Sequence, residues 1–211
     1  MITHFTQQHD AMLAMIKQLV ELESPSSDAE RLNVLADHLA ATFAPLGTVE
    51  RHVNPIGGDH ISVHVPAPHA PADVHPALVL CHFDTVWPVG TLASRPFRVE
   101  GDLAYAPGGY DMKASFALAF FALRAVSELG LTLPRPVHLL FTSDEEIGSP
   151  AGRPVIEAAD SKAAYTLVLE PPVEPHNALK TARKGGGHFV VEIIGRAAHA
   201  GVEPEKGASA V

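Results

Sequence analysis

The stretch Ala77-Leu-Val-Leu-Cys-His82 decides the fold of this chain. It is a continuous apolar run that ends at a histidine, and such runs are typical of strands buried on both faces of a sheet. Runs of the same kind recur at 137–142 and 165–170, and helix-like segments separate them. Strands that alternate with helices predict an α/β protein, in which a mixed, mostly parallel sheet is flanked by helices.

Around this core the sequence predicts further elements. Apolar residues at helical spacing indicate a helix over 3–23, and a second helix is expected from Ser27, which has capping-box spacing to Glu30, to about residue 44. The remaining predictions are strands near 47–53 and 59–65, a hairpin over 97–105, and helices over 112–129 and 150–159.

The character of the sequence changes from about residue 181. A basic, glycine-rich link covers 181–187, a strand is predicted over 188–194, and 207–211 resembles the first turn of a helix. We therefore expect a catalytic domain over 1–180 and the beginning of a smaller α+β domain over 181–211.

Composition excludes several classes of function. The chain has 211 residues, a net charge of −9 at pH 7 and no basic stripe, so a nucleic-acid partner is not expected. Residues 1–10 lack the features of a secretory signal, and no apolar run approaches the roughly 20 residues of a membrane span. The single cysteine, Cys81, is expected to be a buried thiol. The cytoplasm is the expected compartment.

Acidic residues and one histidine follow the predicted strands where these strands end. His82 closes the first buried strand. Glu145 and Glu146 follow the second strand, and Glu170 closes the third. Ligands of open α/β sheets lie beyond the carboxyl ends of the strands, so these side chains are expected on one rim. Asp111 lies in a glycine-flanked loop that can reach this rim, and the whole set suits a metal-assisted hydrolase.

Each cluster suits a separate part of such chemistry. Asp84, two residues beyond His82, can accept a hydrogen bond from the imidazole and fix its tautomer. Asp111 is a short carboxylate in a turn and suits the space between two cations about 3.5–4 Å apart. Glu145 and Glu146 are adjacent, so in an extended segment their side chains diverge. We assign Glu146 to metal and Glu145 to the general base.

Each cluster alone also has an ordinary structural interpretation. A His-x-Asp pair often forms a turn, and Glu170 before two prolines could simply end a strand. Asp144 is expected to be solvated or turn-forming rather than a ligand. Four clusters at one rim are hard to explain by solubility, which favours the functional interpretation. Other histidines in or near a proline-rich loop are not expected to bind metal: His60, His64, His69 and His75.

Four motifs in combination carry a resemblance to a known family. They are Cys81-His-Phe-Asp-Thr-Val86, Tyr110-Asp-Met-Lys113, Ser143-Asp-Glu-Glu-Ile-Gly-Ser149 and Leu169-Glu-Pro171. With these motifs the chain resembles the dinuclear zinc peptidases and deacylases that include glutamate carboxypeptidase, acetylornithine deacetylase and succinyl-diaminopimelate desuccinylase. The pattern is nearest to bacterial glutamate carboxypeptidase, and the resemblance extends over essentially the whole chain.

The resemblance implies a role in metal binding for four positions. His82 and Glu170 would bind one zinc ion, and Glu146 would bind the other. Asp111 would bridge the two ions. A complete site of this family holds two Zn²⁺, for which Co²⁺ or Mn²⁺ can substitute, and its second ion also takes a histidine from a later segment that this sequence does not contain.

The resemblance also implies a catalytic base, a lid and a partner. Glu145 would activate the water between the metals. The family's lid domain mediates a homodimer, and a lid histidine that matches His199 would reach the partner's active site and help to stabilise the tetrahedral intermediate. This role of His199 rests on the resemblance only.

Taken together, these features predict a zinc-dependent amidohydrolase that cleaves a C-terminal peptide bond or an N-acyl amino acid. The chain stops inside a predicted helix, so we expect a C-terminally truncated piece with little or no turnover. Two alternatives stay open. One is a non-catalytic relative that keeps the fold, and the other is a module in which His82, Asp111 and Glu170 hold a single metal.

Overall fold

The computed structural model describes residues 1–187 and 189–210. By its contacts the chain divides into two units, Met1–Pro171 and Pro172–Val211, each described by itself below. The helices of the first unit are α1 (Ile2–Gln7), α2 (His9–Glu21), α3 (Ala29–Phe43), α4 (Thr91–Ser94), α5 (Ala114–Glu128) and α6 (Gly152–Asp160). Its strands are β1 (Thr48–His52), β2 (His60–Val65), β3 (Ala77–His82), β4 (Arg98–Glu100), β5 (Leu103–Tyr105), β6 (Val137–Thr142) and β7 (Tyr165–Val168). The boundary that we expect after residue 180 stays a prediction.

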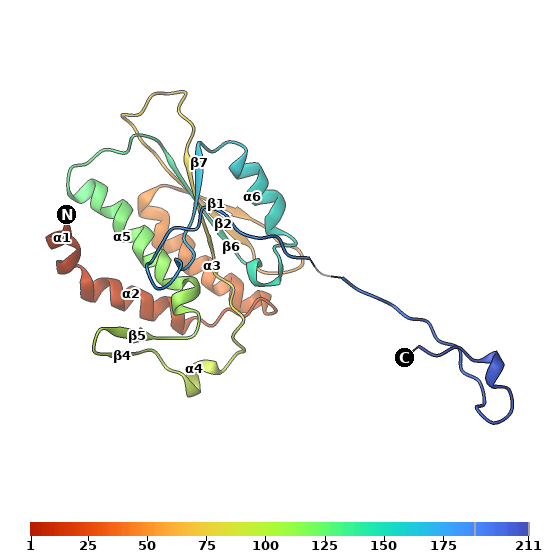
Figure 1. Ribbon diagram of the computed structural model, residues 1–211. Coiled ribbons are helices and arrows are strands. Elements are labelled where there is room, and N and C mark those ends of the chain that lie inside the picture. The colour runs from red at the N-terminus through yellow and green to blue at the C-terminus, as the bar shows by residue number, and fades with distance from the viewer. Residues whose placement is uncertain (188, 211) are drawn as a thin grey trace. The chain divides into compact units, whose positions relative to one another are not determined.

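One sheet, in the strand order β1-β2-β6-β3-β7, forms the centre of the first unit (Figure 1). β1 pairs with β2 and β2 with β6 in antiparallel fashion, whereas β3 lies parallel to both β6 and β7. The parallel part contains the three apolar runs of the sequence, because helices connect these runs and return the chain to the same edge. The predicted α/β fold with a mixed sheet flanked by helices is confirmed.

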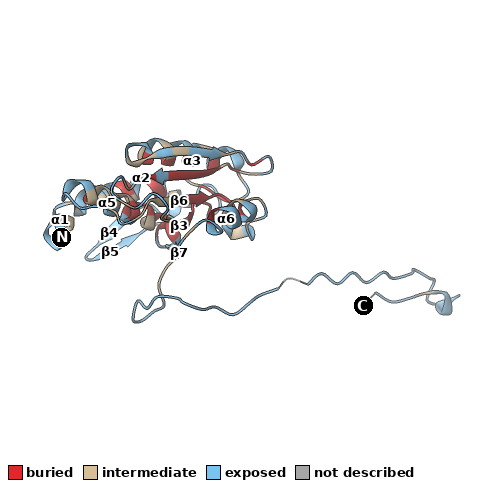
Figure 2. Cartoon of the chain, turned by 90° about the horizontal axis from the view of Figure 1, so that it is seen from above, coloured by how far each residue is buried: buried red, intermediate tan, exposed pale blue. Residues whose placement is uncertain are grey.

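The face of the sheet that α2, α3 and α5 cover carries the main apolar core. Alternate residues of a strand point to the same face, and Ile61 of β2 stands directly opposite Phe141 of β6 on this face. Phe43 of α3 and Phe116 of α5 contact the ring of Phe141, at centroid distances of 4.9 and 5.3 Å. Figure 2 shows the buried residues gathered between these layers. This packing fixes the position of β6, the strand that leads to Glu145.

The opposite face of the sheet is covered only in part. Ala159 of α6 packs against Leu78 of β3 and Leu140 of β6, with neighbouring apolar residues of the same helix around it. On this face β1 and β2 present polar side chains instead, among them Glu50 and Ser62, which are opposite each other in the ladder. A groove therefore remains beside α6.

The N-terminal helices differ in detail from the prediction. The expected helix over 3–23 is divided at Gln8, whose N–H donates to Phe5 O while its own carbonyl oxygen accepts from Met12 N–H in α2. The next helix is capped by Asp28 rather than Ser27, since the Asp28 carboxylate accepts the Arg31 N–H at 3.1 Å. The capping-box prediction was wrong by one residue because aspartate is an equally good N-cap.

The hairpin and the long apolar helix are present as predicted. β4 and β5 pair around Gly101, and α5 ends at Glu128 with Gly130 at φ +64°, the conformation that a C-terminal glycine supplies. Across residues 1–187 and 189–210, no helix combines the length and apolarity needed to cross a bilayer.

The third apolar run is not buried on both faces, and that prediction was wrong. β7 ends at Val168, two residues earlier than expected. Leu167 and Val168 are about half exposed, at 50% and 53%. The reason is topological, because β7 lies at the edge of the sheet and pairs only with β3 among the described strands.

The second unit contains little regular structure in its described residues. Two isolated bridges join Val173 to Ala178 and Arg196 to Ala208, and a 3₁₀ turn covers Pro204–Lys206. The strand predicted over 188–194 is absent from residues 189–194, which find no partner strand within the described part of this unit. The helix predicted from residue 207 is also wrong, since Ala208 pairs in extended form with Arg196. His188 and Val211 lie outside the described residues.

Candidate metal and catalytic site

The candidate site lies where the parallel strands end. His82 is the last residue of β3, and only 3% of its surface is exposed. The distance from His82 Nε2 is 3.1 Å to Asp111 Oδ1 and 3.1 Å to Glu170 Oε1. Glu145 Oε2 lies 4.0 Å from the same nitrogen. The structure thus brings four of the predicted side chains together at one rim of the sheet.

Asp111 reaches this rim on a tight loop that needs a glycine at its start. Gly108 has φ +66°, and a Cβ atom at this position would lie 2.6 Å from Thr85 Cγ2. Both the backbone conformation and the close approach therefore require glycine. The main-chain N–H of His82 donates to Met112 Sδ at 3.3 Å, which holds the loop against the end of β3.

A buried lysine holds the other end of the same loop. Lys113 is 1% exposed, and its Nζ donates to Leu22 O at 2.7 Å, just beyond α2. Burial lowers the pKa of Lys113 to about 7, although the charge of Glu23 opposes this shift. Lys113 belongs to the Tyr110–Lys113 motif, but no local sequence pattern predicts this structural role. Its position two residues after Asp111 was the available signal.

Glu145 and Glu146 lie in a 3₁₀ turn, Glu145–Ile147, and not in the extended segment that we predicted. Gly148 N–H donates to Glu145 O at 2.8 Å and closes the turn. The main-chain N–H groups of Glu145 and Glu146 each donate to an oxygen of the Asp84 carboxylate at 3.1 Å. One carboxylate that binds two consecutive amides draws the chain into a turn, which is why the extended geometry is not adopted.

Asp84 is fully buried, and it contacts other groups in addition to His82. The His82 Nδ1 atom lies 3.1 Å from the main-chain oxygen of Asp84 and 3.4 Å from its Oδ1. Ser26 Oγ donates to Asp84 Oδ2 at 2.7 Å, a contact that the sequence did not predict. Burial alone would raise the pKa of Asp84, but the hydrogen bonds from His82 and Ser26 dominate and lower it. Asp84 is therefore an ionised anchor between His82 and the 3₁₀ turn Glu145–Ile147, which we call the glutamate turn.

Asp144 anchors the far side of the glutamate turn. It is 3% exposed, so the expectation of a solvated residue was wrong. Its Oδ2 accepts the N–H groups of Ala151 and Gly152, at 2.7 and 2.8 Å, where α6 begins. On the other side, Ser143 N–H donates to the buried His60 Nδ1 at 3.2 Å. The turn-forming function fits these contacts, since unpaired amides at a helix start attract a carboxylate.

Two sets of side chains could each hold a metal ion through three atoms that lie within 4.8 Å of one another. The first set is His82, Glu145 and Glu170, and the second is His82, Asp111 and Glu146. An imidazole nitrogen with carboxylate oxygens is a donor set that zinc accepts. The residues present therefore fit a divalent cation of this kind.

The electrostatics of the rim also favour a cation. Burial, and after it the charges of Glu170, Asp84 and Asp111, raise the pKa of Glu145, although His82 opposes the rise. The pKa of Glu146 is raised as well, again mainly by burial. Burial would lower the pKa of the His82 imidazole, but the carboxylates of Asp84 and Glu170 raise it to about 11. In the metal-free protein a proton on His82 Nε2 therefore faces the carboxylates of Asp111 and Glu170, where a metal ion would bind.

His199 belongs to the second unit. It is exposed, and its Nδ1 accepts the N–H of Gly201 at 3.2 Å. The contact that we expect between His199 and the active site of a partner stays a prediction.

A second set of histidines lies in the groove beside α6, which has a volume of about 700 Å³. The Nε2 atoms of His52 and His138 each lie 2.8 Å from Ser62 Oγ. His64 Nε2 lies 3.3 Å from Glu50 Oε2, and its ring centroid is 4.4 Å from that of His138. We call these five residues the histidine groove. In the described residues, none of them belongs to a set of three converging metal donors.

Comparison with known proteins agrees with this fold and identifies a family. The model of peptidase family M20/M25/M40 matches residues 78–207. This match includes β3 from Leu78 onward, the loop of Asp111, the turn Glu145–Ile147 and Glu170. The structure is an α/β fold in which one histidine and several carboxylates gather at one rim of the sheet. The chain belongs to the M20/M25/M40 peptidase family.

Curated relatives include both peptidases and deacylases. The chain is 32% identical over 209 residues to carboxypeptidase G2 of Pseudomonas sp. (strain RS-16), which covers 98% of this chain and 49% of that protein. It is 32% identical over 140 residues to acetylornithine deacetylase of Pasteurella multocida, covering 64% and 34%. For succinyl-diaminopimelate desuccinylase of Nitratiruptor sp. the identity is 35% over 133 residues, covering 59% and 35%. The chain spans about half the length or less of these relatives.

Solved structures share the fold at lower identity. Human carnosine dipeptidase 1 matches with a TM-score of 0.69 at 17% identity, over 81% of this chain and 40% of that one. The M20 family metallo-carboxypeptidase Sso-CP2 of Sulfolobus solfataricus matches with a TM-score of 0.62 at 20% identity, over 79% and 38%. These likenesses concern the fold.

Proposed function

We propose that this chain carries the greater part of the active site of a zinc-dependent amidohydrolase, which cleaves a C-terminal peptide bond or an N-acyl amino acid. The observation that carries the proposal is the convergence of Asp111 and Glu170 on His82 Nε2, both at 3.1 Å, with Glu145 at 4.0 Å. Membership of a peptidase family, and relatives named as a carboxypeptidase and as deacylases, support the same chemistry.

Zinc would be held by His82, Asp111 and Glu170, with Glu146 turned to a second ion that Asp111 shares. When bound, zinc supplies a Lewis acid that polarises a carbonyl and favours ionisation of water. His82 must bind as the neutral imidazole, so its Nδ1–H is directed to Asp84, as the distances of 3.1 and 3.4 Å allow.

Glu145 would act as the general base. Its carboxylate stands at the rim, half exposed, on a turn that the Asp84 carboxylate holds through two amides. The pKa of Glu145 is raised by burial, which makes the carboxylate a better proton acceptor than an exposed glutamate. It would take the proton of the attacking water and deliver it to the leaving nitrogen. Such general-base catalysis contributes typically 10²–10⁴-fold.

The remaining parts of the proposal concern regions outside this rim. In the complete enzyme a lid domain would form a homodimer, and His199 would stabilise the tetrahedral intermediate at the partner's site. The substrates would be small peptides or N-acyl amino acids.

Replacement of the base tests its assignment. Glu145→Gln in the full-length gene product should bind zinc nearly as tightly as the wild type and lose roughly 10²–10⁴-fold in kcat, because the amide cannot accept the proton. Glu146→Gln is the matched control, and it should weaken zinc binding instead. Loss of zinc from Glu145→Gln, with kcat per bound zinc unchanged, would sink the assignment.

A single-metal site is the second candidate, and one observation favours it for this chain alone. Both sets of donors include His82, whose Nε2 has one lone pair. The described residues can therefore complete only one three-donor set at a time. Elemental analysis of the purified chain after zinc loading and dialysis should give one zinc per chain. Two zincs per chain would show that the dinuclear site closes without a further histidine, and none would contradict both candidates.

A further inference from the structure

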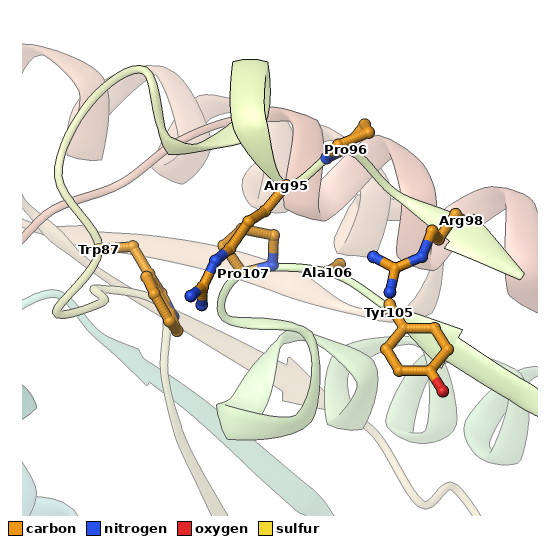
Figure 3. Close-up of a pocket in the computed structure, with 7 residues that line it drawn as sticks. All are labelled: Trp87, Arg95, Pro96, Arg98, Tyr105, Ala106 and Pro107. Atoms are coloured by element: carbon orange, nitrogen blue, oxygen red, sulfur yellow. The ribbon is translucent and has the colours of Figure 1, made fainter.

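A cavity of about 380 Å³ lies between the loop that follows β3 and the β4–β5 hairpin. Figure 3 shows its lining, in which Arg95 lies beside Trp87 and Arg98 is directed to Tyr105. The two guanidinium groups lie on either side of the Ala106–Pro107 segment in this view. The residues that line the cavity are Trp87, Arg95, Pro96, Arg98, Tyr105, Ala106 and Pro107.

The backbone positions these side chains firmly. Arg98 and Tyr105 are direct partners in the β4–β5 ladder, so the guanidinium carbon lies 4.2 Å from the centroid of the ring. The loop with Trp87 and Arg95 is tied to the end of α2, because the Glu23 carboxylate accepts the N–H groups of Gly90 and Leu92 at 2.8 and 3.1 Å. The loop after β3 thus places Arg95 on the ring of Trp87, and the hairpin places Arg98 on the ring of Tyr105.

The arginines keep hydrogen-bond donors for a ligand. The Arg95 side chain lies over Trp87 at 5.0 Å and makes no hydrogen bond or ion pair within the part of the chain that the structure describes. Arg98 uses Nε to bind Glu100 Oε1 at 2.7 Å, so its two terminal nitrogens stay available. A guanidinium that is stacked on a ring keeps its edge for planar, bidentate recognition of a carboxylate. In a chain of net charge −9 this pair is a local positive site.

We propose that this cavity binds a small organic carboxylate whose planar or apolar body rests on Trp87, Tyr105 and the prolines. The arginines would hold the carboxylate, with Arg95 dominant because Arg98 is shared with Glu100. The aromatic and proline walls favour an organic carboxylate over an inorganic anion, since stacking on the rings adds to the ion pair with arginine. No residue of its lining is a proposed metal ligand or the proposed base, so binding here does not depend on the proposed hydrolysis.

The chain contains a single tryptophan, and this tryptophan lies in the cavity. Binding can therefore be followed by the fluorescence of Trp87, with isothermal calorimetry as a second readout. Both are recorded on metal-free protein in the presence of a chelator, which removes any binding of carboxylate to zinc. The probes are benzoate, benzamide as a neutral molecule of the same shape, and inorganic phosphate as an anion without an apolar body.

We expect saturable binding of benzoate, weaker binding of phosphate, and no saturable response to benzamide. Arg95→Met should weaken benzoate binding roughly tenfold or more, because one charged hydrogen-bond donor set is lost, and Arg98→Met should weaken it less. Arg153→Met, which removes an exposed arginine of α6 far along the chain, is the control of equal charge change and should have no effect.

Four results would overturn the proposal. Equal binding of benzamide and benzoate would mean an apolar pocket that does not recognise charge. Equal weakening by Arg153→Met and Arg95→Met would mean a general effect of net charge. Absence of benzoate binding in calorimetry as well as fluorescence would mean that the cavity takes no such ligand. Tighter binding of phosphate than of benzoate would assign the arginines to an inorganic or phosphoryl anion and contradict the organic carboxylate.

Discussion

The rim around His82 and the histidine groove both carry imidazole side chains on the same sheet, and the surroundings of these imidazoles are opposite. His82 is faced by carboxylates, with Asp111 and Glu170 at 3.1 Å, and its pKa is raised to about 11. His138 is faced by Ser62 and by other imidazoles, and its pKa is lowered to about 4, first by burial and then by the charges of His64 and His52.

The difference indicates that a cation site depends on several carboxylates that converge on one imidazole, and not on the number of histidines. The groove contains more imidazoles than the rim, yet His52 Nε2 and His138 Nε2 share one hydroxyl oxygen, Ser62 Oγ, and do not converge on a cluster of carboxylates. The rim has one imidazole and an excess of carboxylate oxygens around it, and a dication offsets their mutual repulsion. We expect metal chemistry at the rim and structural polarity in the groove.

The largest expected effect that separates the two regions is the loss of His82. His82→Ala should weaken zinc binding by more than roughly 100-fold, beyond the 10–100-fold that loss of an outer partner costs. His138→Ala, the matched change in the groove, should leave the zinc affinity unchanged. Competition with a chromophoric chelator measures both dissociation constants. Equal weakening by the two variants would show that the groove shares in metal binding and would break the comparison.

Asp84 provides the next largest effect. Asp84→Asn should weaken zinc binding by about 10–100-fold, because the amide no longer orients His82 as a carboxylate does and holds the Glu145 turn with one acceptor oxygen in place of two. Glu50→Gln removes the carboxylate of the histidine groove and should not change zinc affinity. The same chelator competition applies, and an unchanged dissociation constant for Asp84→Asn would contradict the anchoring role.

Much of this contrast follows from the sequence, because it depends on strand ends. His82 and Glu170 stand at the ends of apolar runs, and Glu145 follows a third, so parallel pairing alone places them on one rim. The groove was harder to foresee. His52, Ser62 and His138 come from three strands, and only the register of two antiparallel pairings brings them together.

Other parts of the site depend on contacts between distant segments, which no local pattern contains. Ser26 reaches Asp84 across 58 residues of sequence, and Lys113 reaches Leu22 across 91. Its own motif predicts Asp144 as a solvated or turn-forming residue, and only the start of α6 explains its burial. The extended geometry assigned to Glu145 failed for the same reason, since the Asp84 carboxylate from another loop sets the turn.

Proton binding offers a third, smaller test of the comparison. The metal-free folded protein should keep His82 protonated up to about pH 11 and His138 neutral down to about pH 4, against 6.5 for both in an ordinary environment. Stability from the raised pKa of His82 is fully present below pH 6.5 and is lost as the pH rises towards 11. Stability from the lowered pKa of His138 is present above pH 6.5 and is lost as the pH falls towards 4.

Two measurements check these signs. Nuclear magnetic resonance of the imidazole Cε1–H groups should show no titration of His82 or His138 between pH 5.5 and 8. Zinc binding should release one proton from His82 in this range, so the apparent affinity rises by up to about tenfold per pH unit. Calorimetry in buffers of different ionisation enthalpy counts this proton. Titration of His82 near pH 6.5 would contradict the raised pKa of His82, and with it the electrostatic difference between the rim and the histidine groove.

The smallest expected effect comes from the centre of the histidine groove. Ser62 is 1% exposed, and its Oγ is within hydrogen-bond distance of His52 Nε2 and His138 Nε2, both at 2.8 Å. Ser62→Ala should lower the free energy of unfolding by about 1–3 kcal/mol, because two partly buried imidazole nitrogens lose a partner, and urea unfolding measures this change. Zinc affinity should not change, whereas Ser26→Ala, which removes the hydroxyl from Asp84, should reduce it. If the two serine variants affected zinc equally, the groove and the rim would be one coupled network, and the opposite pKa shifts of their histidines would have to be explained together.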